Sequence, residues 1–105
     1  MKIPKKLKIG GVTYEVQETK NLTLGNANYS GEIDYTDCVI RICPCNPQKM
    51  KADFCHEMVH GILDHLGYTD HDEKKVDEFA KALYMIFEDN PEIFEKEEEN
   101  HGNKI

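Results

Sequence analysis

The chain has 105 residues, of which 39% are hydrophobic and 31% are charged, a composition typical of one small folded domain. The formal net charge of −7 at pH 7 disfavours a nucleic acid as partner, because phosphate binding needs a basic surface. No stretch approaches the roughly 20 apolar residues of a membrane span, and the basic start lacks the apolar segment of a secretory signal. The sequence therefore predicts a cytoplasmic protein with no membrane and no nucleic-acid partner, and it does not indicate an oligomeric state.

The first half of the chain alternates apolar and polar residues in the way that β-strands do. Residues 6–17 alternate on both sides of Gly10-Gly11 and predict a hairpin. Residues 18–28 are polar and predict a loop. A second alternating pair, residues 29–35 and 38–42, is separated by a two-residue turn. Four such strands predict a small antiparallel sheet.

After Asn46 the apolar period becomes helical. Asn46 is a good N-cap, Pro47 suits the first helical position and Gly67 suits the C-terminal stop, so a helix of about five turns is expected between them. A second amphipathic helix starts at Glu73, and Asn90-Pro91 ends or kinks it. The side chains expected to face the core are Met50, Phe54, Met58, Val59, Ile62, Leu63 and Leu66 on the first helix and Val76, Phe79, Ala80, Leu83, Ile86 and Phe87 on the second.

These elements predict one α+β domain, residues 1–94, in which the small sheet packs on two helices. Residues 95–105 are polar and acidic and predict a disordered tail. The spacings of the four cysteines match no zinc finger, so free, reduced thiols are expected, with a metal site of the first three as the alternative. The cysteines are Cys38, Cys43, Cys45 and Cys55, and the last is expected to be a small buried residue.

Residues 56–60 read His-Glu-Met-Val-His, an H-E-x-x-H pattern inside the first predicted helix. His56 and His60 lie one turn apart on the same helix face, so both imidazoles can reach one ion. Zinc held by two histidines and a third ligand keeps a position open for water and lowers the pKa of that water to roughly 7. Glu57 lies about 100° around the helix, within reach of such a water. The pattern predicts zinc as cofactor and Glu57 as general base.

A third protein ligand is required, and Glu73 is the best placed because it begins the second helix. Asp77 follows one turn later on the same face, where it can accept the free N–H of a ligand histidine and fix its tautomer. A structural interpretation competes, because Asp70 and Glu73 also form a D-x-x-E capping box. The H-E-x-x-H pattern favours Glu73 as a zinc ligand over that interpretation.

His71, in the loop between the helices, is the alternative third ligand and would give a three-histidine site. His65 is excluded, because a residue nine positions after His56 points roughly 180° away from it.

The segment HEMVH followed by EKKVDEFAKAL resembles the short zinc metallopeptidases of the ImmA/IrrE type, which are common in phages and mobile elements. The second helix of that family reads approximately E-x-x-A-[ND]-x-F-A-x-x-L. The matching positions here are Glu73, Val76, Asp77, Phe79, Ala80 and Leu83, with valine replacing the usual alanine at position 76. The resemblance implies zinc ligands His56, His60 and Glu73, general base Glu57, and Asp77 as the partner of a ligand histidine.

The same resemblance implies a minimal, gluzincin-like zincin fold, with the sheet packed on the helix that carries H-E-x-x-H. In zincins an edge strand of the sheet commonly binds the substrate in extended form. The strand at residues 39–42 is expected to have this role by β-augmentation.

The segment HGILDHLGYTDH also resembles the H-G-x-L-H-L-x-G-Y-D-H motif of YbeY-type bacterial endoribonucleases. That motif needs its first two histidines at i and i+4, whereas His60 and His65 are five residues apart and so lie on different helix faces. The sequence therefore predicts a zinc metalloendopeptidase that cleaves a narrow protein or peptide substrate, such as a regulator. The alternatives are a non-catalytic, metal-stabilised binding module and, less favoured, an endoribonuclease.

Overall fold

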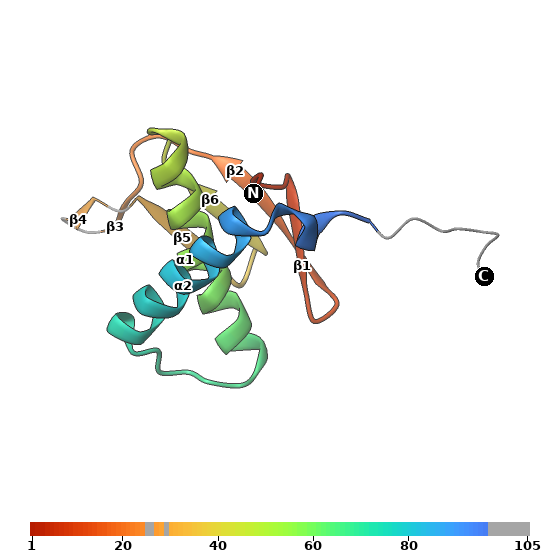
Figure 1. The fold of residues 1–105 in the computed structure, drawn as a ribbon. Helices are drawn as coiled ribbons and strands as arrows, with labels where there is room; N and C mark the ends of the chain where they lie inside the picture. Colours follow the sequence, from red (N-terminus) through yellow and green to blue (C-terminus); the bar gives the residue numbers. More distant parts are fainter. Residues whose placement is uncertain (25–26, 29, 97–105) are drawn as a thin grey trace.

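The structure, a computed structural model, describes residues 1–24, 27–28 and 30–96. A four-stranded sheet and two helices make up an α+β fold, followed by a short 3-10 helix (Figure 1). The sheet consists of β1 (Lys6–Ile9), β2 (Val12–Glu18), β5 (Gly31–Asp34) and β6 (Val39–Ile42), and the other elements are the two-residue strands β3 (Thr23–Leu24) and β4 (Ala27–Asn28), the helices α1 (Pro47–His65) and α2 (Glu73–Asp89), and η1 (Pro91–Phe94).

The sheet is mixed, with strand order β1-β2-β6-β5. Two hairpins are antiparallel as predicted, but β2 and β6 pair in parallel, with Val16 opposite Ile40. The prediction of an all-antiparallel sheet is therefore wrong, because alternation has a period of two residues in either kind of ladder. Residues 39–42 lie between β2 and β5, so the prediction that they form an edge strand is wrong too. The outer strand on that side is β5.

Helix α1 is the middle layer of the fold. It contacts β1, β5 and β6 on one side and α2 on the other (Figure 1). The core is accordingly divided into two clusters of buried side chains, one between the sheet and α1 and one between the helices. The first consists of Tyr14, Ile40, Ile42 and Phe54, and the second of Cys55, Val59, Val76 and Ala80. The H-E-x-x-H residues thus lie on the helix that packs against both the sheet and α2.

The ends of α1 follow the predicted signals. The side chain of Asn46 accepts a hydrogen bond from the Lys49 amide at 2.9 Å, and Pro47 opens the helix, which satisfies one of the free N–H groups of its first turn. Gly67 has a φ of +95° just after the helix, a conformation that glycine adopts without steric cost. The prediction that Ile62 and Leu66 face the core is wrong, because both side chains are exposed.

The start of α2 differs from the prediction. Its N-cap is Asp72, whose carboxylate accepts from the amides of Lys74 and Lys75, and not Asp70. Glu73 is therefore the first helical residue and not part of a D-x-x-E capping box, so its carboxylate is free for other contacts. Phe79 and Ile86, predicted to be buried, are exposed, because α2 is the outermost layer and only one narrow side of it meets α1.

Residues 95 and 96 are exposed, and most of the predicted disordered tail, residues 97–105, lies outside the described residues. All four cysteines lie in described segments and are free thiols, as predicted. Cys55 is fully buried, and burial raises the pKa of its thiol to about 11. No helix in the described part of the chain is long and apolar enough to cross a membrane.

Gly10 in the β1–β2 turn provides a stability test. It has a φ of +56°, and a Cβ at this position would collide with the ring of His65. Gly10→Ala should therefore cost more than the about 1–2 kcal/mol of a left-handed non-glycine residue. Gly11→Ala, at φ +88° with no atom of the described residues within 4 Å of the added Cβ, should cost only the backbone part. Urea unfolding measures the stability of both variants. Adding His65→Ala to Gly10→Ala should recover part of the lost stability. Equal losses for the two glycine variants would contradict the contact between Gly10 and the His65 ring.

Candidate metal centre

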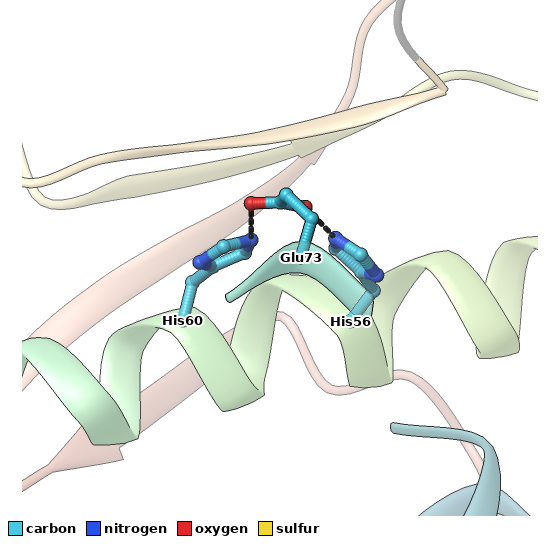
Figure 2. A group of neighbouring side chains, drawn as sticks. All are labelled: His56, His60 and Glu73. Atoms are coloured by element: carbon cyan, nitrogen blue, oxygen red, sulfur yellow. Dashed lines mark ion pairs between the residues drawn. The ribbon is translucent and has the colours of Figure 1, made fainter. Parts of the chain in front are cut away.

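Two histidines of α1 and one glutamate of α2 meet at the contact between the helices. Glu73 Oε1 lies 3.3 Å from His56 Nε2, and Glu73 Oε2 lies 3.1 Å from His60 Nε2. Figure 2 shows the carboxylate spanning the two imidazole rings. Within the described residues, His56, His60 and Glu73 form the group that could hold a metal ion, with one ligand atom from each lying within 4.8 Å of the others.

The spacing of these atoms fits a small four-coordinate cation. Ligands at about 2.1 Å from a tetrahedral ion lie about 3.4 Å from one another, close to the 3.3 and 3.1 Å between the two histidine nitrogens and the two oxygens of Glu73. Imidazole and carboxylate donors in this combination suit zinc and other first-row divalent ions. The cysteines are not part of this group, and no second group of three donors occurs among residues that the structure places. The alternative site at Cys38, Cys43 and Cys45 therefore has no support.

The environment of His60 favours the form of the side chain that binds metals. Burial lowers the pKa of His60, and the neighbouring rings of His56 and His71 lower it further, although Glu73 opposes them. A lower pKa leaves the imidazole neutral at pH 7, with a lone pair available for a cation. His60 is therefore prepared for metal binding without having to lose a proton first.

The side chain of Glu57 lies against β5 of the sheet. Only 7% of the residue is exposed, and a Cβ added to Gly31 of β5 would lie 3.2 Å from Glu57 Oε2. The absence of a side chain at Gly31 thus leaves room for this carboxylate. Burial raises the pKa of Glu57 to about 8, and the charges of Glu73, Asp53 and Glu32 contribute to the same shift. A buried carboxyl group with a raised pKa is typical of a general acid or base.

This pKa shift predicts an unusual pH dependence of the metal-free protein. Glu57 binds its proton up to about pH 8 in the folded state but only up to about pH 4.3 in the unfolded state. The folded state therefore holds the extra proton between these values, and stability falls as the pH rises through this window. Between pH 5 and pH 8, wild type should lose about 2–4 kcal/mol relative to Glu57→Gln. Urea unfolding with a chelator present measures this, and parallel curves for the two proteins would contradict it.

The structure places the two other predicted residues behind the histidine rings. Asp77 Oδ1 lies 3.8 Å from His56 Nδ1, a distance longer than a hydrogen bond, and Asp77 Oδ2 pairs with Lys81 at 2.9 Å. His71 Nδ1 lies 2.7 Å from His60 Nδ1. Since Glu73 approaches the other nitrogen, Nε2, of each ring, Asp77 and His71 both lie on the side of the rings remote from Glu73.

His56, His60 and Glu73 line a cleft of about 530 Å³. The sequence pattern did not single out the wall that β5 provides, although alternation does place Gly31 and Ile33 on one strand face. Tyr35 follows β5, and its hydroxyl donates to the carbonyl oxygen of His60 at 3.3 Å. The cleft is lined by Gly31, Glu32, Ile33, Tyr35, His56, Glu57, His60 and Glu73.

No protein-family model, curated protein or solved structure matches this chain. The resemblance to ImmA/IrrE-type peptidases therefore stays a prediction from the H-E-x-x-H and E-x-x-V-D motifs.

Proposed function

We propose that this protein is a zinc-dependent metallopeptidase of minimal zincin type, similar to the ImmA/IrrE group. The observation that carries the proposal is the position of Glu57, a buried carboxyl group that shares one cleft with His56, His60 and Glu73 but is not in their ligand group. A metal that only stabilises a fold does not need such a group. A base beside an open metal position is what hydrolysis requires.

His56, His60 and Glu73 would hold zinc, with Glu73 as the third ligand. Its carboxylate faces Nε2 of both histidines, whereas His71 meets only Nδ1 of His60. Zinc bound here would polarise a peptide carbonyl and lower the pKa of a water molecule. The positive charge of the ion would also favour the ionised form of Glu57. Glu57 then takes a proton from the attacking water and returns it to the leaving amine.

The substrate would lie along β5. This strand pairs with β6 alone among the described strands, and Gly31, Glu32 and Ile33 line the cleft. An extended peptide can add to such an edge through main-chain hydrogen bonds, with its side chains in neighbouring pockets. A cleft of about 530 Å³ accepts few substrate side chains at a time, which favours a narrow protein or peptide substrate over general proteolysis.

Two observations favour this function over its alternatives. A binding module with a structural metal would close the site with a fourth protein ligand, and no fourth donor joins the trio in the part of the chain that the structure describes. An endoribonuclease of the YbeY type would bring His65 to His60. Instead, the ring of His65 lies against Gly10, in the turn between β1 and β2.

A peptide library tests the proposal although the substrate is unidentified. Zinc-loaded protein is incubated with a digest of proteome-derived peptides, and new termini are identified by mass spectrometry. We expect a small set of related cleavage sites, which a zinc chelator removes and added zinc restores. Zinc-loaded protein that leaves the library and folded candidate regulators intact would favour the binding module.

A further inference from the structure

A row of hydrogen-bonding groups continues from the metal site into the loop between α1 and α2. His60 Nδ1 lies 2.7 Å from His71 Nδ1, and His71 Nε2 lies 2.9 Å from the carbonyl oxygen of Tyr68. The rings of His60 and His71 are nearly parallel, with their centroids 5.0 Å apart and their planes at 22°. Both nitrogens of His71 therefore have a partner, and one of these partners is His60.

The positions of the protons in this row follow from its last member. A carbonyl oxygen can only accept, so His71 Nε2 carries a hydrogen and donates it to Tyr68. In a ring with one proton, His71 Nδ1 is then an acceptor, and His60 Nδ1 must be the donor across the 2.7 Å contact. With a metal ion at Nε2, the single proton of His60 would be on Nδ1, and the lone pair of Nε2 would face the ion. Nε2 is also the nitrogen that faces Glu73 at 3.1 Å, and a carboxylate oxygen only accepts, so this tautomer belongs to the metal-bound ring.

We propose that His71 is a positioning residue, which fixes the tautomer and the ring orientation of His60 for metal binding. The inference rests on the proposed function only in that His60 binds the metal through Nε2. The partner of a ligand histidine usually contributes to metal affinity by these two effects. Among the residues that the structure describes, His56 has no partner so close at Nδ1, where Asp77 Oδ1 lies at 3.8 Å. His71 thus holds its histidine more closely than Asp77 does. Through His71, the conformation of the α1–α2 loop is connected to the metal site.

Three variants test this role through zinc affinity, measured by competition with a chromophoric chelator. His71→Leu removes the acceptor and should weaken zinc binding roughly 10- to 100-fold. His71→Asn places an acceptor oxygen close to the position of Nδ1 and should restore most of this loss. His65→Ala is the matched control, because it removes a histidine whose ring lies against Gly10, and it should bind zinc as wild type does.

NMR of the zinc-loaded protein provides a readout that general destabilisation would not change. Wild type should show a downfield-shifted proton on His60 Nδ1, with a scalar coupling across the hydrogen bond to His71 Nδ1. The coupling should be absent in His71→Leu and in His71→Asn, while the shifted proton should persist in the latter.

Wild-type affinity in His71→Leu, no coupling in wild type, or a wild type that binds no zinc would each overturn the role of His71. A loss of zinc as complete as that in Glu73→Ala would show that His71 is a ligand and overturn it as well. A protein with the coupling and the affinity change, but without hydrolysis of any peptide, would separate the outcomes: His71 would keep its role, and the peptidase proposal would fail.

Discussion

Glu57→Gln is expected to abolish turnover while zinc remains bound. Glutamine has nearly the same shape but cannot accept a proton, so kcat should fall by roughly 10²- to 10⁴-fold, the usual contribution of a general base. The zinc affinity should change little, because Glu57 is outside the ligand group. The neutral amide also suits a site in which burial already raises the pKa of the carboxyl to about 8, so the variant should fold at least as well as wild type.

The measurement is the cleavage rate of a library-derived peptide at saturating zinc, with zinc content determined on the same samples. Glu78→Gln is the matched control, because Glu78 is an exposed glutamate of α2 outside the cleft, and it should retain the wild-type rate. A Glu57→Gln rate close to that of wild type would exclude Glu57 as the base and, with it, the mechanism.

Glu73→Ala is expected to have the largest effect on metal binding. The substitution removes the carboxylate that spans both histidines at 3.1 and 3.3 Å and leaves a site with two protein ligands. The loss of zinc affinity should exceed the about 100-fold that removal of an indirect partner causes. Competition with a chelator measures this loss.

Glu78→Ala is the control for Glu73→Ala, because it removes the same chemical group from the same helix outside the metal site. It should bind zinc as wild type does. Zinc binding that survives in Glu73→Ala at near wild-type strength would move the third ligand to His71, the alternative in the sequence, and would contradict the assignment of Glu73.

The grouping of His56, His60 and Glu73 could be predicted because it depends on local geometry. Residues at i and i+4 share a helix face whatever the rest of the fold does, so His56 and His60 had to lie together once α1 formed. The start of α1 was equally local, since Asn46 and Pro47 are adjacent signals. Predicting the position of Glu73 also depended on the short loop after α1, which returns the chain to the face that carries His56 and His60.

The remaining features depend on contacts between distant parts of the chain. Alternation predicted β6 as a strand, but it could not show that β6 pairs in parallel with β2 and so lies inside the sheet. The exposure of Phe79 follows from the position of α2 as the outer layer, which its amphipathic pattern does not reveal. The contact of His71 with His60 depends on how a loop side chain is oriented, and sequence spacing does not determine that.

Metal analysis of wild type is the most direct test of the central claim. The protein is purified without added metal and without a metal-binding tag, and its metal content is measured by native and elemental mass spectrometry. The geometry of His56, His60 and Glu73 predicts a single zinc ion per folded chain, which a chelator removes. A chain that contains no zinc, and takes up none on reconstitution, would contradict the metal centre and every catalytic role assigned around it.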